Sequence, residues 1–503
     1  MVRTVPLSKR AALVIAQLCA VALCLALSVL PVRAQSGQTL QQVKTLVVDS
    51  LGPGKNDDLL RSYLIRQLGK KGGYTIVDDK SSADAVVKGS GEIWIKSYEA
   101  TNWRSPRNNR QAVYSGFLSV EVIGRDGATL WSYMATPYKL IWTNIADELA
   151  GNLVKAMVAA REQAADPFMS APAMHLAPAT LHGAGATFPA PLYVRWFQSF
   201  HLSNPGIQLN YDAVGSEAGL KMLQEGEVDF ATSDAASPDV RDLKLGTGYW
   251  RVPVVLGAVV PAYNVSGLSE DLRFTPEVLA GIYLGKIRKW NDPEIRRWNH
   301  GVDLPDADIV VIHRSDGSGT TYTFSDYLSK VRPEWNDKLG VAYQLNWPVG
   351  IAADGNAGVA SAIDKTPNSI GYVELVYAIR RQLAFGSVRN SSGVFVRANL
   401  DSVAEAAKDT GSATSGGPAA ITNASRKGAY PIATYTWMVL PQQISDGAKR
   451  AALLAMLEWV LTEGQKECSA LAYTPLPRVV ADQQLELVKT LMKPASTEPP
   501  AKP

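Results

Sequence analysis

Short apolar runs alternate with amphipathic stretches over the larger, second part of the chain. The runs lie at 207–211, 228–231, 254–260 and 309–312. Each has the length of a buried strand, and the stretches between them carry apolar residues at helical spacing. This order predicts an α/β fold with mainly parallel strands, whose ligand loops follow the carboxyl ends of the strands. Because a segment from 181 to 490 exceeds one comfortable core, we expect two lobes.

The first part of the chain has the pattern of a small α+β domain between about 40 and 165. We expect Asn56 to cap a helix, and a second helix carries apolar residues on one stripe at 145–157. Asp126-Gly127 predicts a hairpin turn. The strand candidates lie at 46–48, 74–77, 85–95, 113–123 and 128–133.

Two segments rich in proline lack any periodic pattern. Residues 166–180 carry three prolines among alanines, which predicts a linker between the small domain and the larger unit at 181–490. Residues 491–503 carry four prolines and few apolar side chains, which predicts a disordered tail.

The amino terminus has the pattern of a secretory signal. Basic residues precede an apolar run at 11–29, and a small-residue cleavage site ends at Ala34. We expect 1–34 to be removed and the mature chain to be periplasmic. An uncleaved membrane anchor is the alternative, because the run is nearly long enough to span a bilayer.

Removal of the signal changes both charge and cysteine content. Four cations and no acid leave with it, so the formal charge falls from +3 to −1. A near-neutral chain lacks the basic footprint of a nucleic-acid-binding protein. Cys468 is the only cysteine left, which excludes an intrachain disulfide.

The most chemically specific segment is 313–321, with the sequence HRSDGSGTT. Its two glycines allow backbone N–H groups to converge on an anion, and the amphipathic run after it predicts that the loop opens a helix. The helix N-terminus and the guanidinium of Arg314 both favour a tetrahedral oxyanion. A plain helix cap beside a surface arginine would explain the same residues without a ligand. We interpret His313 as structural.

Three more loops of the larger unit carry similar chemistry. Thr187 precedes a helix with early prolines, and we expect it at the N-cap with its hydroxyl pointing outward. Ser216 opens a second helix, and Asp234 follows the strand at 228–231. Each could be an everyday element terminus. Four such loops with one cation in a single α/β unit favour an oxyanion site.

Five motifs in this unit resemble those of one family. They are GAGATFPAPLY (183–193), VDFATSDA (228–235), YLGKIRKWNDP (283–293), HRSDGSGTTYTFSDYLSKV (313–331) and SIGYVE (369–374). From about 183 to 476 the chain resembles the periplasmic phosphate-binding protein of phosphate-specific ABC transporters. The resemblance implies a two-lobed, type II periplasmic-binding-protein fold with a hinged cleft. Lobe I would comprise about 181–260 and 432–490, and lobe II about 261–431.

The resemblance also implies which residues contact phosphate. By motif they are Thr187, the Phe188 backbone, Ser216, Asp234, Arg314, Ser318, Gly319 and Thr320. Asp316 matches an acid that orients the arginine. Two positions depart from the family: Glu217-Ala218 replace part of a Gly-rich stretch, so Glu217 must point away from the anion, and Ala357 follows Asn356 where the family has an acid. We expect the departure at Ala357 to affect loop structure more than ligand contact.

The resemblance further implies how the site discriminates and moves. Asp234 would accept the P–O–H of phosphate, whereas fully ionised sulfate would meet only lone pairs there. We expect the hinge strands near 258–263 and 428–436, and the anion as the only bridge between the lobes.

The implied partners are inorganic phosphate and the permease and ATPase subunits of the transporter, with no catalytic residue, no metal and no cofactor. Two alternatives remain: a binding protein for another oxyanion, such as sulfate or arsenate, and a secreted phosphomonoesterase. Against an esterase, the five histidines show no metal-ligand spacing. Small α+β domains at the start of envelope proteins often mediate contacts, so this domain could dock the protein to the envelope, contact a partner or act as a spacer.

Overall fold

The computed structural model describes residues 38–51, 56–100, 110–127, 129–137, 144–162, 176–237, 248–268, 271–408 and 420–492. From Thr39 onward the described residues belong to one compact unit. The predicted signal, the first ten residues of the predicted linker and the predicted tail beyond 492 lie outside the described residues. In the described part of the chain, no helix is long and apolar enough to cross a membrane.

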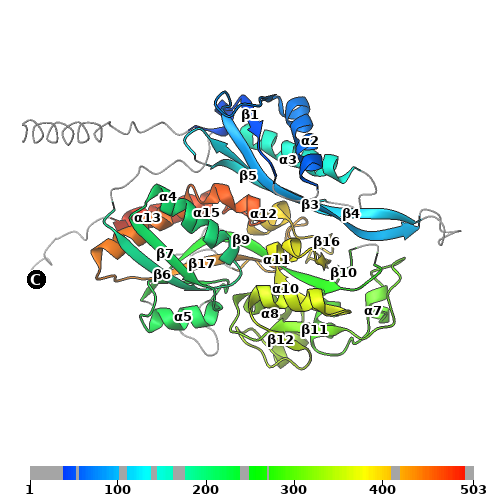
Figure 1. Cartoon of the computed structure of the whole chain (residues 1–503). Helices are drawn as coiled ribbons and strands as arrows, with labels where there is room; N and C mark the ends of the chain where they lie inside the picture. Colours follow the sequence, from blue (N-terminus) through cyan, green and yellow to red (C-terminus); the bar gives the residue numbers. More distant parts are fainter. Residues whose placement is uncertain are drawn as a thin grey trace, which may run out of the picture. The chain divides into compact units, whose positions relative to one another are not determined.

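The small domain is built on a sheet with the strand order β2-β1-β3-β4-β5 (Figure 1). The strands are β1 (Thr45–Val48), β2 (Thr75–Ile76), β3 (Ala85–Ala100), β4 (Arg110–Gly124) and β5 (Thr129–Ala135), and the helices are α2 (Asp57–Gln67) and α3 (Ile145–Glu162). These elements match the predicted ones in type and order. Asn56 is the N-cap residue of α2 as predicted, but its side chain makes no capping hydrogen bond and donates to the Ile93 carbonyl at 3.0 Å.

The alternating sequence of β4 gives the small domain two different faces. Leu118, Val120 and Val122 are buried among α2 and α3, as expected for one face of a strand with period two. Ser119 and Glu121 project from the opposite face toward the larger part of the chain. The Ser119 hydroxyl donates to the Ala470 carbonyl at 2.7 Å.

Strand β5 makes further contacts of the same kind. The Ser132 hydroxyl accepts from the Ala470 backbone N–H at 3.2 Å and donates to the Lys466 carbonyl. Met134 is 6% exposed and belongs to the hydrophobic core of the larger part. The small domain is therefore docked on the segment 465–471 through buried polar and apolar groups.

The larger part is organised around a sheet with the order β12-β11-β13-β9-β17-β8-β6-β7 (Figure 1). Its strands are β6 (Ala179–Gly185), β7 (Ile207–Asp212), β8 (Phe230–Ser233), β9 (Tyr249–Asn264), β11 (Val310–Arg314), β12 (Ile351–Ala353), β13 (Ser369–Glu374) and β17 (Ala433–Pro441), with β14 (Ala384–Phe385) beside β9. A separate small sheet contains β10 (Arg273–Phe274), β15 (Ser387–Arg389) and β16 (Phe395–Val396).

The helices of this part lie between the strands or follow one another. They are α4 (Ala190–Ser203), α5 (Ser216–Gln224), α6 (Pro276–Tyr283), α7 (Pro293–Arg296), α8 (Gly319–Val331), α9 (Pro333–Lys338), α10 (Gly355–Lys365), α11 (Leu375–Arg380), α12 (Leu400–Ala407), α13 (Gly447–Leu461), α14 (Gln465–Cys468) and α15 (Arg478–Met492). The aromatic stripe of α4 is buried, with Tyr193, Trp196 and Phe200 at most 1% exposed.

Strand β9 divides the sheet into two lobes. Its residues up to Ala258 pair antiparallel with β17, and those from Val259 onward pair antiparallel with β13. We call the side with β6, β7, β8, α4, α5 and the C-terminal helices lobe I, and the side with β11, β12, β13, α8 and α10 lobe II. In lobe I, β6 pairs parallel with β7 and β8, and β17 pairs antiparallel with β8. In lobe II, β11 pairs parallel with β12 and β13.

Only one of the two predicted hinge segments lies entirely within a strand. The segment 258–263 lies in β9, where the pairing changes from β17 to β13, whereas the segment 428–436 includes the start of β17 at Ala433. The predicted lobe boundaries near 260 and 432 lie beside these points. The division of the chain into domains and lobes at those residue numbers remains a prediction.

Candidate functional site

The predicted ligand loops all follow the carboxyl ends of strands. Thr187 and Phe188 follow β6, Asp234 follows β8 directly, and Ser216 starts α5 after β7. Arg314 is the last residue of β11, and the loop after it opens α8. Parallel strands bring such ends to one edge of a sheet. The structure therefore brings together the residues that the four separate motifs predicted.

Arg314 is held by a carboxylate in a forked ion pair. Its Nε donates to Asp316 Oδ1 at 2.6 Å, and its Nη2 pairs with Asp316 Oδ2. The guanidinium side chain is only 1% exposed, so its direction is fixed by this fork rather than by solvent. Gly355 N–H donates to Asp316 Oδ1 at 3.1 Å and anchors the carboxylate in turn. Asp316 thus has the geometry expected of a residue that orients the arginine.

Asp234 is a buried carboxyl at the end of β8, 1% exposed. Thr436 donates its hydroxyl to Oδ1 at 2.6 Å. Burial raises the pKa of Asp234 from 3.8 to about 7, and the Thr436 hydrogen bond and the Arg314 charge offset only part of that rise. The carboxyl is therefore poised to hold or release a proton near neutral pH.

The N-termini of two helices meet at this edge. Ser318 is the N-cap of α8, where its hydroxyl accepts from the Thr321 N–H at 3.1 Å. Gly319 N–H donates to the Ser216 hydroxyl at the start of α5, also at 3.1 Å. The first turns of α5 and α8 carry backbone N–H groups without intrahelical partners, which gives the region a positive potential. Both serines are fully buried.

Thr187 does not cap α4. The helix begins at Ala190 with Pro189 at the N-cap, so the expectation of Thr187 at that position is wrong. Proline at 189 fixes the backbone that enters the helix, and Thr187 lies two residues before this N-cap. The Thr187 and Phe188 carbonyls instead accept from the Tyr377 and Tyr473 hydroxyls at 2.7 and 2.6 Å. These two contacts fix the loop from both sides.

Asn356 is a site residue that the sequence reasoning did not assign. Its Nδ2 lies 3.0 Å from the hydroxyl oxygens of both Thr187 and Thr320. The Thr320 oxygen also accepts from Arg314 Nη1 at 3.3 Å. The signal is present in the motif Asn356-Ala357-Gly358, in which Asn356 agrees with the family and Ala357 departs from it. Ala357 is exposed and Asn356 is completely buried.

The lobes contact each other directly across this site, so the expectation that an anion is the only bridge is wrong. Glu217 N–H of α5 donates to the Gly317 carbonyl of lobe II at 3.0 Å. The Thr323 hydroxyl of α8 donates to the Asp234 carbonyl at 3.2 Å. The Glu217 carboxylate pairs with Lys221 at 2.7 Å and lies against Gly317. A side chain at Gly317 would collide with it.

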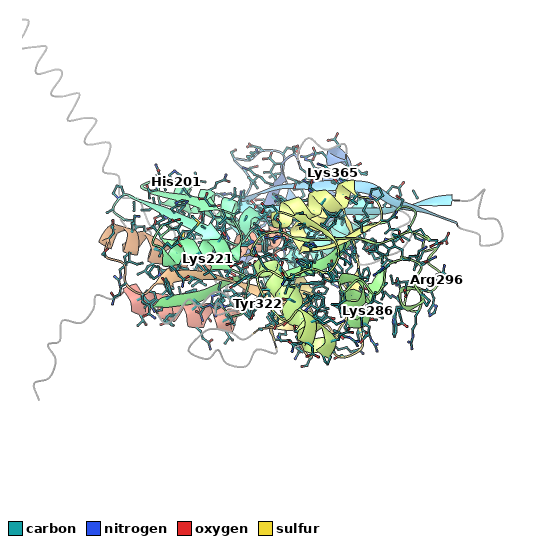
Figure 2. The ribbon with its side chains drawn as sticks, turned by 90° about the horizontal axis from the view of Figure 1, so that it is seen from below. His201, Lys221, Lys286, Arg296, Tyr322 and Lys365 are labelled. Atoms are coloured by element: carbon teal, nitrogen blue, oxygen red, sulfur yellow. The ribbon has the colours of Figure 1, made fainter. Side chains whose placement is uncertain are left out.

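An apolar cluster also joins the lobes beside the polar groups. Tyr322 of α8 packs with Leu220 and Leu223 of α5 and with Tyr343. Figure 2 labels Tyr322 and Lys221, which come from these two helices. The contacts between lobes are therefore both polar and apolar.

His313 makes only structural contacts. Its ring stacks on Trp347 with centroids 5.1 Å apart, and its Nδ1 lies 3.1 Å from the Arg314 carbonyl. Burial lowers its pKa, which favours the neutral ring. These contacts support the interpretation of His313 as structural.

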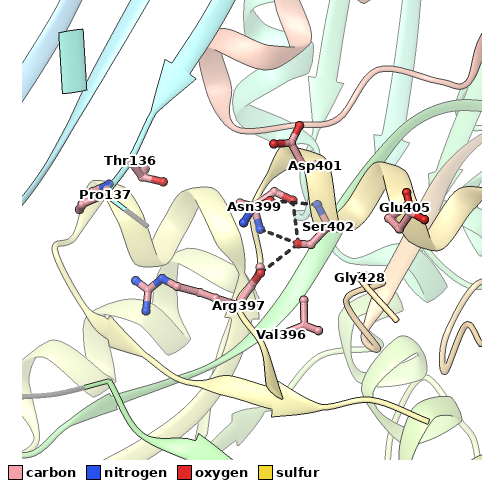
Figure 3. Close-up of a pocket in the computed structure, with 10 residues that line it drawn as sticks. Thr136, Pro137, Val396, Arg397, Asn399, Asp401, Ser402, Glu405 and Gly428 are labelled. Atoms are coloured by element: carbon pink, nitrogen blue, oxygen red, sulfur yellow. Dashed lines mark hydrogen bonds between the residues drawn. The ribbon is translucent and has the colours of Figure 1, made fainter. Parts of the chain in front are cut away.

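A pocket of about 390 Å³ lies away from these loops, beside α12 (Figure 3). Several of its polar groups are already engaged: Asn399 and Ser402 form a capping box, and Arg397 pairs with Asp271. Glu405 pairs with Lys408 and Arg426. We therefore assign no ligand to this pocket.

Among the described residues, no group of three or more histidine, cysteine, aspartate or glutamate side chains could hold a metal ion.

Comparisons with known proteins give a consistent picture. Residues 171–463 match the family model of the PBP superfamily domain. The chain is 40% identical over 299 residues to a phosphate-binding protein PstS of Xylella fastidiosa, which covers 59% of this chain and 81% of the relative. It is 36% identical over 316 residues to the PstS protein of Pasteurella multocida, covering 62% of this chain and 91% of the relative.

A more distant relative and a solved structure extend the comparison. The PstS protein of Methanocaldococcus jannaschii is 33% identical over 334 residues, covering 61% of this chain and 85% of the relative. A solved structure of a high affinity periplasmic phosphate-binding protein bound with phosphate is 21% identical, with a TM-score of 0.49, and covers 61% of this chain and 92% of that one.

Proposed function

Because the chain belongs to the family of PstS phosphate-binding proteins, we propose that it is the substrate-binding component of an ABC import system for inorganic phosphate. It is a binding protein rather than an enzyme. It captures phosphate in the periplasm and delivers it to the membrane permease, whose ATPase subunits drive import.

The observation that carries this proposal is a buried cation and a buried acid on opposite lobes, with hydroxyls between them. Arg314 of lobe II and Asp234 of lobe I are 4% and 1% exposed. Arg314 and the hydroxyls supply donors for the unprotonated oxygens of phosphate, and Asp234 supplies one acceptor for its P–O–H. Such a mixed set of groups suits a partly protonated oxyanion better than a fully ionised one.

We propose as phosphate contacts the residues that the family motifs indicate. They are the Thr187 hydroxyl, the Phe188 backbone, Ser216, Asp234, Arg314, Ser318, Gly319 and Thr320. Asp316 orients the arginine through its two-point ion pair. The Ser318 oxygen accepts from the backbone of α8, which leaves its hydroxyl hydrogen to donate to the anion.

The small domain gives the chain a second role in this proposal. It is docked on lobe I and contributes none of the proposed phosphate contacts. We propose that it provides a surface for an envelope partner while the two lobes bind phosphate. The amino-terminal signal directs the mature chain to the periplasm.

Calorimetry on the mature chain tests the proposed function. We expect one phosphate per chain and much weaker binding of sulfate under the same conditions. A mature, folded chain that binds neither anion would contradict the proposal. Sulfate binding as tight as phosphate binding would leave an oxyanion site but remove the assigned role of Asp234. Release of phosphate from a generic monoester would point to the phosphomonoesterase instead.

A further inference from the structure

The side chain of Asn356 connects two proposed phosphate contacts, one in each lobe. Its Nδ2 lies 3.0 Å from Thr187 Oγ1 of lobe I and 3.0 Å from Thr320 Oγ1 of lobe II. The residue is completely buried at the start of α10. Both hydroxyls therefore share one amide group that solvent does not reach.

The orientation of this amide is fixed by the backbone. Glu374 N–H donates to Asn356 Oδ1 at 2.9 Å. A backbone N–H can only donate, so the amide oxygen must lie on that side and the NH₂ group must face the threonines. The two Nδ2 hydrogens are then directed at two hydroxyl oxygens, neither of which can donate to them.

Each threonine oxygen also receives a second donor. The Asn356 backbone N–H donates to Thr187 Oγ1 at 3.2 Å, and Arg314 Nη1 donates to Thr320 Oγ1 at 3.3 Å. A hydroxyl oxygen has two lone pairs and can accept two hydrogen bonds. With both lone pairs occupied, each hydroxyl retains only its own O–H, as a donor.

We infer that Asn356 sets the hydrogen-bond polarity of the phosphate site by making Thr187 and Thr320 obligate donors to the anion. The inference rests on the proposed function. Phosphate oxygens without a proton need donors, and a donor oriented before binding loses less freedom on binding than a hydroxyl that can also turn to accept. Asn356 is a positioning residue, because it acts through the two hydroxyls.

Asn356→Asp tests this role with little change in size. The carboxylate still accepts from Glu374 N–H, but it also accepts from both threonine hydroxyls and turns them away from the anion. We expect phosphate affinity, measured by calorimetry, to fall about 100-fold, because two hydrogen bonds to a charged ligand are lost.

Asn299→Asp is the matched control. Asn299 is 5% exposed, its Oδ1 accepts from the Arg273 N–H at 2.8 Å, and its Nδ2 donates to the Ile295 carbonyl at 2.9 Å. It has the same pattern of one backbone donor and an amide that donates, but it contacts none of the proposed site residues. We expect this variant to bind phosphate within about twofold of the parent.

The introduced charge also repels the anion, so the decisive comparison is made without the hydroxyls. In a Thr187→Val, Thr320→Val background, Asn356→Asp retains the repulsion but has no hydroxyl to reorient. We expect its effect there to shrink to about 10-fold or less. Equal losses in the two backgrounds would overturn the inference.

Two further outcomes keep the test decisive. If Asn356→Asp does not fold, Asn356→Ser is compared in the same two backgrounds, because serine is too short to reach both threonines. This variant too should weaken binding more in the parent than in the valine background. Failure of the parent itself to bind phosphate would refute the proposed function together with the inference, whereas equal losses in a parent that binds phosphate would refute the role of Asn356 alone.

Discussion

Replacing Gly319 by alanine places a methyl group of lobe II directly against lobe I. An added Cβ would lie 2.8 Å from both the backbone N and the Oδ2 of Asp234, and closer still to the Ser216 hydroxyl. The Asp234 backbone cannot rotate away as a flexible side chain would. The lobes must therefore separate slightly to accept the methyl group.

The size of the effect follows from the cost of overpacking. Extra methyl groups in packed sites cost about 1–3 kcal/mol. Because separation of the lobes relieves the collision, the cost falls on the closed, ligand-bound state. We expect phosphate to bind roughly 5- to 150-fold more weakly, with the melting temperature of the unliganded protein unchanged.

Calorimetry with phosphate and thermal melting without it measure both quantities. Gly358→Ala is the matched control, because its Cβ would find the nearest atom at 3.7 Å, in the backbone of Ala353. This control should bind phosphate as the parent does. Parental affinity in Gly319→Ala would refute the argument that Gly319 sets the closest approach of the lobes.

Three more predictions concern charge, protons and the small domain. Arg314→Ala should weaken phosphate binding by several kcal/mol, because a charged donor is removed from a desolvated anion. Binding at the parental level in calorimetry would show that the site is elsewhere. The pKa of Asp234 is raised to about 7, so the carboxyl gains a proton and becomes a donor as the pH falls through 7, and the protein should then bind sulfate more tightly. In Asp234→Asn the sulfate affinity should lose this pH dependence, and selectivity for phosphate over sulfate should drop. A chain truncated to begin near Ala177 should bind phosphate within a few-fold of the full chain. It should melt at a lower temperature, because it loses Met134 and the Ser119 and Ser132 hydrogen bonds. A large loss of affinity with the fold intact would show that the small domain regulates the cleft.

The sequence predicted the placement of the four loops because their signals are local. An apolar strand followed by Gly, Ser, Thr or Asp and then a helical stripe is visible within about twenty residues, and parallel topology brings such strand ends together. The role of Asp316, two residues after Arg314, came instead from the resemblance to the family.

The features that the sequence did not predict depend on distances between residues that are far apart in the chain, which no local pattern indicates. Asn356 reaches Thr187 and Thr320 only because the two lobes meet, and nothing near 356 in the sequence indicates how closely they approach. The direct hydrogen bond between Glu217 and Gly317 was missed for the same reason. The cap of α4 was misplaced because prolines at 189 and 191 both suit a first helical turn, so the pattern leaves the helix start undetermined by about two residues.

The docking of the small domain on the segment 465–471 determines which of the two lobes stays fixed when the small domain is held. Ser119, Ser132 and Met134 attach the domain to lobe I through buried contacts, so we expect the two to move together when the cleft changes shape. A partner that holds the small domain would immobilise lobe I as well. All of the displacement caused by phosphate would then be carried by lobe II, which a probe placed on α8 or α10 could follow in the tethered protein.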